Sequence, residues 1–117
     1  MYSLCIPTMD RYDNFLSKYI PLYLKNNLID EIIITDENGN DVNKIKQCIN
    51  DLDKLKLYVN ETKLGPFMNK LNACKLAKNE WIALIDSDNF ADEDYFIIAK
   101  KYIETNNLKK ETILSPS

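Results

Sequence analysis

Short apolar runs recur along this chain, and segments with helical spacing of apolar residues lie between them. Residues 31–35 (Glu-Ile-Ile-Ile-Thr) contain three consecutive isoleucines, and residues 81–85 (Trp-Ile-Ala-Leu-Ile) are apolar throughout. Apolar runs without alternation are typical of strands covered on both faces. Residues 3–7 and 55–59 also predict strands. Strands and helices alternate along the chain, and the connections between them are short. This pattern predicts a three-layer α/β fold in which helices flank a mainly parallel, Rossmann-like sheet.

Four helices and a further strand complete this expected pattern. The first helix would be capped by Asp10 or Asp13 and would end or kink at Pro21. The third would start at Pro66, which suits a first helical turn. A fifth strand is expected at 112–114. The stripe that the third helix is expected to bury consists of Phe67, Met68, Leu71, Cys74, Leu76 and Ala77.

Composition excludes several classes of site. With 117 residues and a net charge of -3, we expect one domain that does not bind nucleic acid. Histidine is absent, which excludes a Ser-His-Asp triad. Cys5, Cys48 and Cys74 include no close pair for zinc and are expected to be reduced and buried in a cytoplasmic protein. Gly39 and Gly65 are the only glycines, so a glycine-rich phosphate loop is excluded. No signal peptide or transmembrane segment is predicted.

Polar residues follow three of the predicted strands, at 7–8, 36–37 and 86–88. Ligands of parallel α/β sheets bind beyond the carboxyl ends of the strands. Asp86 and Asp88 form a D-x-D motif, and converging carboxylates repel each other unless a cation lies with them. Their oxygens favour Mg²⁺ or Mn²⁺, which can bridge a diphosphate. An Asp-rich turn that caps the next helix would produce the same pattern without a ligand.

Four segments of the chain, in this order, resemble the amino-terminal half of family 2 glycosyltransferases, which have the GT-A fold. The resemblance spans about residues 3–96. It implies that residues 1–117 form a single GT-A-like domain that binds a nucleotide sugar. The matching segments are residues 4–8 (Leu-Cys-Ile-Pro-Thr), residues 32–39 with their two acidic residues, Asn60 with Gly65 before the third helix, and residues 81–89 with the D-x-D motif.

The resemblance also implies roles for individual residues. Pro7 and Thr8 would line the nucleobase pocket with backbone groups. Asp36 would accept the imide N–H of uracil, although an Asp at a strand end is also a good turn former. Asp86 would contact the ribose and the metal, and Asp88 would ligate the metal directly.

Two basic residues would complete the donor site. Lys70 stands where the family usually has Arg and would lie near the base or the diphosphate, although Lys lacks the planar fork of Arg. Leu71 replaces the usual Asn of the same element. Arg11, the only arginine, follows the first strand and could reach phosphate. A solvated lysine on a helix face would explain Lys70 without a ligand.

The expected reaction is inverting transfer of a sugar, from a uridine-linked donor and with Mn²⁺ or Mg²⁺, to an acceptor hydroxyl. Family members take the acceptor site and catalytic base from a carboxyl-terminal half, and only 29 residues follow Asp88. No catalytic base is therefore assigned, and turnover by this chain alone stays open. The acceptor could be a glycan, a lipid or a protein. A homo-oligomer or a missing carboxyl-terminal segment could supply the rest.

Two other classes of protein fit parts of the pattern. A non-catalytic nucleotide-binding or structural α/β module would need only the sheet. A haloacid-dehalogenase-like phosphotransferase also places D-x-D after an apolar strand. It expects Thr or Val two residues after the second Asp, where this chain has Phe90.

Overall fold

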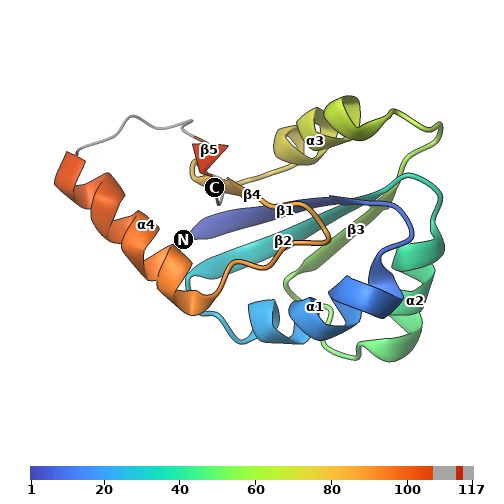
Figure 1. Ribbon diagram of the computed structural model, residues 1–117, viewed down its shortest axis with the longest axis horizontal. Helices are drawn as coiled ribbons and strands as arrows, with labels where there is room; N and C mark the ends of the chain where they lie inside the picture. The colour runs from blue at the N-terminus through green and yellow to red at the C-terminus, as the bar shows by residue number, and fades with distance from the viewer. Residues whose placement is uncertain (107–112, 115–117) are drawn as a thin grey trace.

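A sheet of five parallel strands forms the middle layer of the protein (Figure 1). The structure is a computed structural model that describes residues 1–106 and 113–114. The strand order β3-β2-β1-β4-β5 confirms the predicted parallel α/β sheet. The strands are β1 (Tyr2–Thr8), β2 (Ile29–Asp36), β3 (Leu55–Val59), β4 (Ile82–Leu84) and β5 (Ile113–Leu114).

Helices cover both faces of this sheet, as predicted. Helices α1 and α2 lie on one face and α3 lies on the other (Figure 1). Pro21 lies inside α1 rather than at its end, because the buried side chains of Ile20 and Tyr23 pack into the core on both sides of it. A π-helical turn, η1 (Tyr12–Leu16), precedes α1. The helices are α1 (Ser17–Leu24), α2 (Asn40–Cys48), α3 (Pro66–Lys75) and α4 (Glu93–Asn106).

The isoleucine run of β2 is buried throughout, as its lack of alternation predicted. Ile32 and Ile34 join the main core, which also contains buried side chains of α1 and α2. Ile33 points to the other face, where it packs with Cys5 and Ala73. Side chains alternate along a strand, so the central positions of a strand covered on both faces are apolar in succession.

Helix α3 contacts the sheet through small and polar side chains. Its buried residues are Asn69 and Ala73. The Asn69 amide donates to the Thr35 carbonyl at 3.0 Å. Phe67 is 71% exposed and Leu71 is 40% exposed. The prediction that these two side chains are buried is wrong, and it is also wrong for Met68 and Leu76, because Asn69 and Ala73 occupy the inner face instead.

The cysteines are free, as expected, but they are not all buried. Cys5 is buried, Cys74 is partly buried and Cys48, at the end of α2, is exposed. The expectation of three buried thiols is therefore wrong for Cys48. In the part of the chain that the structure describes, no helix is long and apolar enough to cross a membrane.

Candidate functional site

A cavity of about 340 Å³ lies at the carboxyl ends of the central strands. Strand β1 contributes Pro7 and Thr8 to its wall, and the segment after β4 contributes Asp86 and Asp88. The three strand ends that the sequence singled out therefore meet at one place, since Glu37 follows β2. The full lining consists of Pro7, Thr8, Met9, Arg11, Glu37, Lys63, Pro66, Asn69, Lys70, Asp86, Ser87 and Asp88.

The structure brings six of the seven predicted site residues to this cavity. They are Pro7, Thr8, Arg11, Lys70, Asp86 and Asp88. Asp36 is the exception. These positions show which side chains lie together, and the role of each residue stays a prediction.

The Asp36 carboxylate is turned away from the cavity toward the start of α2. It accepts hydrogen bonds from the backbone N–H of Val42 at 3.0 Å and of Asn38 at 3.3 Å, and the residue has no exposed surface. Burial raises the pKa of Asp36, although these two N–H groups act in the opposite direction. In this arrangement the carboxylate contacts the start of α2 and does not line the cavity. A contact between Asp36 and uracil stays an untested prediction.

Glu37, the next residue, does line the cavity and was not among the predicted site residues. Its Oε1 accepts from Asn60 Nδ2 at 2.7 Å and from Leu64 N at 3.1 Å. Its Oε2 accepts from Gly65 N at 2.8 Å. Burial alone would raise the pKa of Glu37, but these hydrogen bonds outweigh it and hold the pKa below its ordinary value. Its position beside Asp36 at a strand end is the signal that could have identified it.

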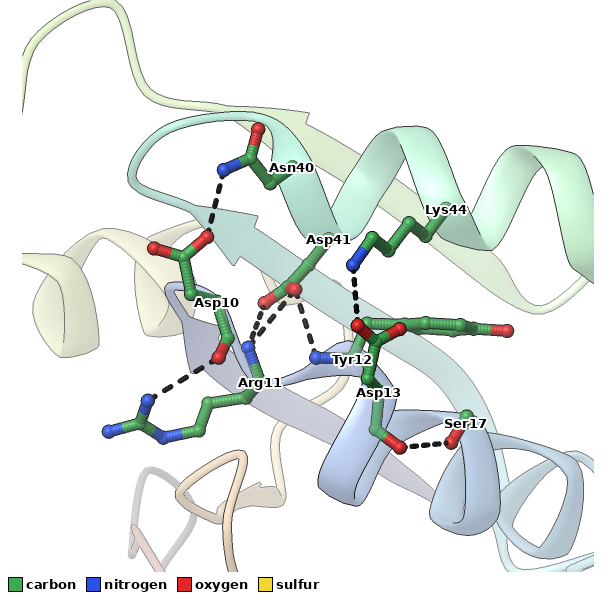
Figure 2. Close-up of polar contacts among 8 residues, drawn as sticks. All are labelled: Asp10, Arg11, Tyr12, Asp13, Ser17, Asn40, Asp41 and Lys44. Atoms are coloured by element: carbon green, nitrogen blue, oxygen red, sulfur yellow. Dashed lines mark hydrogen bonds and ion pairs between the residues drawn. The ribbon is translucent and has the colours of Figure 1, made fainter.

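Asp41, buried in the first turn of α2, holds the segment after β1 in place (Figure 2). Its carboxylate accepts the Thr8 hydroxyl at 2.6 Å and the backbone N–H groups of Arg11 and Tyr12 at 2.9–3.1 Å. Asp10, which has a positive φ of 56°, is held by the side-chain amide of Asn40 at 2.8 Å. The Thr8 hydroxyl is thus committed to Asp41, and α2 holds in place the segment after β1 that lines the cavity.

The opposite wall carries charges of both signs. Lys70 Nζ lies 3.3 Å from Asp86 Oδ1, and both side chains are close to half exposed. Asp88 is exposed. Both carboxylates belong to a turn that is closed by a hydrogen bond from Asn89 N to Asp86 O, and α4 begins only after this turn. Within residues 1–106 and 113–114, no group of three or more His, Cys, Asp or Glu side chains could hold a metal by itself.

Comparison with known families identifies the fold that carries this cavity. The profile of the family described as Glycosyl transferase family 2 matches residues 3–109. The chain belongs to glycosyltransferase family 2. The predicted resemblance is confirmed, and it extends beyond the predicted end at residue 96.

Two relatives and one solved structure show how this family 2 domain compares with longer proteins. It is 31% identical over 110 residues to the uncharacterized glycosyltransferase MG060 of Mycoplasma genitalium, covering 87% of this chain and 37% of that protein. It is 24% identical over 100 residues to the glucosyl-dolichyl phosphate glucuronosyltransferase of Haloferax volcanii, covering 79% and 30%. The structure of S. aureus TarS residues 1–349 matches with a TM-score of 0.70 at 21% identity, covering 91% and 33%. The chain thus spans about a third of the length of these proteins.

Proposed function

We propose that this glycosyltransferase-like domain binds a nucleotide sugar, with uridine as the nucleoside, for inverting transfer of the sugar to an acceptor hydroxyl. The observation that carries the proposal is the cavity itself. It combines two carboxylates after β4 with the basic side chains of Arg11, Lys63 and Lys70. A nucleoside diphosphate carries negative phosphates and polar groups on its ribose and base, and these need both kinds of partner.

The diphosphate would lie between Lys70 and the D-x-D carboxylates. Lys70 is a point charge that can donate to phosphate oxygens. Mg²⁺ in proteins is often bound by one or two carboxylates together with substrate phosphates, so Asp86 and Asp88 fit a Mn²⁺ or Mg²⁺ ion that arrives with the donor. When bound, the ion would neutralise charge on the diphosphate leaving group. Asp86 would have to exchange its ion pair with Lys70 for the metal and ribose.

The base would lie against β1 and the end of β2. Glu37 is the acidic residue there with access to the cavity. A carboxylate offers about four lone-pair sites, and Glu37 uses three of them on protein donors. The remaining site on Oε2 can accept the imide N–H of uracil. We therefore propose Glu37 for the contact that the resemblance assigned to Asp36.

The acceptor and the catalytic base lie outside this proposal. Inversion in one displacement requires a carboxylate that takes the proton of the acceptor hydroxyl as its oxygen attacks the anomeric carbon. Asp92, Glu93 and Asp94 follow the D-x-D motif too closely to match the place of that base in the family. The domain is proposed as the donor-binding part of the reaction.

Calorimetric titration of the chain with UDP, with and without Mn²⁺, tests this proposal. We expect binding that Mn²⁺ strengthens at least tenfold in the wild type. In Asp88→Ala the metal should make no difference, because the exposed carboxylate is lost without disturbing a packed core. Asp94→Ala, another exposed acidic residue a few positions away, is the matched control and should retain the metal effect.

Equal UDP affinity with and without Mn²⁺ in the wild type would refute the assigned metal role. Failure to bind UDP or any other nucleoside diphosphate under both conditions would instead support the structural α/β module.

A further inference from the structure

The outer face of α3 exposes a row of large apolar side chains. The exposed fractions are 36% for Leu64, 71% for Phe67, 49% for Met68 and 40% for Leu71. Residues spaced by three and four positions lie on the same side of a helix, so Phe67, Met68 and Leu71 form one surface, with Leu64 just before it. Single exposed apolar residues are ordinary on protein surfaces, but a contiguous patch marks an interaction site. We call these four residues the α3 patch.

The charges nearest to the α3 patch are lysines, and two of them, Lys70 and Lys78, form ion pairs with Asp86 and Asp30. Residues 62–79 contain four lysines and no Asp or Glu, although the chain as a whole has a net charge of -3. Lys63, Lys75 and Lys78 are exposed. Lys75 lies one helical turn after Leu71 on the same side of α3. The patch is therefore an apolar strip with basic side chains at both ends.

We propose that the α3 patch binds the surface of a lipid bilayer that contains anionic lipids. Phe67, Met68 and Leu71 would enter the boundary between headgroups and acyl chains, while the lysines contact the anionic headgroups. A helix lying in the interface has this combination of an apolar strip with flanking Lys residues. Each lysine near an anionic surface strengthens binding about fivefold. With Lys63 and Lys75 at the ends of one short apolar strip, the association is reversible.

The same charges disfavour the other occupants of this face. A second copy packed symmetrically on the patch would bring Lys75 and Lys63 of both chains together, and like charges destabilise such a contact. Nucleic acid would contact the lysines but would leave Phe67 and Leu71 without a partner. An anionic bilayer satisfies both the apolar strip and the lysines.

The position of α3 links this surface to the cavity. Pro66 and Lys70 line the cavity, and Phe67 and Leu71 follow them directly on the same helix. Docking of α3 on a bilayer would therefore place the cavity beside the headgroup layer. The inference itself does not depend on which ligand the cavity binds.

Co-sedimentation of the full chain with vesicles tests the inference. One set of vesicles is phosphatidylcholine alone, and the other contains phosphatidylglycerol as well. We expect binding to the anionic vesicles at least tenfold stronger than to the neutral ones, and weaker binding at higher salt. A folded wild-type chain that ignores anionic vesicles would overturn the proposal.

Matched variants locate the contact. Phe67→Ser should reduce binding to anionic vesicles about tenfold, whereas Ile98→Ser, which removes a side chain that is 65% exposed on α4, should leave it unchanged. Lys75→Gln should reduce binding about fivefold, while Lys46→Gln on α2 should not. Circular dichroism checks that each variant is folded.

Other outcomes would contradict a bilayer as the occupant. Equal losses in Phe67→Ser and Ile98→Ser would show that the α3 patch is not the contact. A concentration-dependent dimer in gel filtration that Phe67→Ser abolishes would show that a second copy covers the patch.

Discussion

The two ends of the sheet use acidic residues in different ways. At the amino end, Glu31 is buried, and its Oε2 accepts the Ser3 hydroxyl and the Lys78 backbone N–H, both at 2.6 Å. The Ser3 oxygen in turn accepts from the backbone and the side chain of Asn79 at 3.1 and 3.0 Å. At the carboxyl end, Asp86 has one ion pair and is about half exposed.

This difference separates a structural network from a site open to a ligand. Buried polar groups stabilise a fold only when they are paired, and the amino-end network ties the approach to β4 to β1 and β2. Half-exposed charges contribute little to stability and can exchange partners. The comparison predicts that changes at the amino end affect the free energy of unfolding and that changes at the carboxyl end affect nucleotide binding.

Glu31→Ala should have the largest effect on stability. The change removes the acceptor of the buried Ser3 O–H and of the part-buried Lys78 N–H, which costs about 3 kcal/mol of unfolding free energy. Urea denaturation followed by circular dichroism measures it. Asp13→Ala, which removes only the exposed ion pair with Lys44, is the control and should cost less than about 0.5 kcal/mol. Similar losses in the two variants would break the comparison.

Glu37→Gln and Asp36→Asn test which of these two adjacent acidic residues, at the carboxyl end of the sheet, contacts the base. We expect Glu37→Gln to reduce the preference for UDP over ADP about tenfold, equal to about 1.4 kcal/mol, because the amide presents one acceptor oxygen instead of two. Asp36→Asn should lower stability without changing that preference, since its carboxylate is buried against α2. Titration of both variants with UDP and ADP provides the measurement. The reverse pattern would restore the uracil contact to Asp36.

Lys70→Gln should have the smallest effect on stability, because its ion pair with Asp86 is exposed. We expect a change of at most about 0.5 kcal/mol in unfolding free energy and about threefold weaker UDP binding. Lys44→Gln breaks another exposed pair without touching the cavity and should leave UDP binding unchanged. A large loss of stability in Lys70→Gln would place this pair with the structural network instead.

Strand positions were predictable because each strand carries its own signal. The unbroken apolar run of β2 requires cover on both faces, and the α/β alternation then leaves few topologies. The orientation of α3 was not predictable in this way. Apolar spacing identifies one face of a helix but not what that face contacts. The hydrogen bond from Asn69 to Thr35 joins residues 34 positions apart and leaves no local pattern.

The candidate site was predictable in location but not in detail. The rule that ligands bind beyond strand ends brought together Pro7, Thr8, Asp86 and Asp88, because strand ends can be read from the sequence. The choice between two adjacent acidic residues depends on which one turns toward the start of α2. That direction is set by backbone N–H groups of a helix that forms only after β2 ends.

Strand β1 extends beyond the end of β4, and this overhang makes one side of the cavity differ in polarity from the other. The last pair between β1 and β4 is Cys5 with Leu84, whereas β1 runs on to Thr8 beside β2. Backbone groups alternate between the two sides of a strand. Pro7 therefore faces the same side as Cys5, beyond the point where β4 ends. Proline has no N–H, so the overhang presents a carbonyl and no donor. A carbonyl attracts hydroxyl and imide hydrogens and repels phosphate, whereas Lys70 does the opposite. We therefore expect a nucleotide to enter in a single orientation, selected by polarity before any side chain contacts its base.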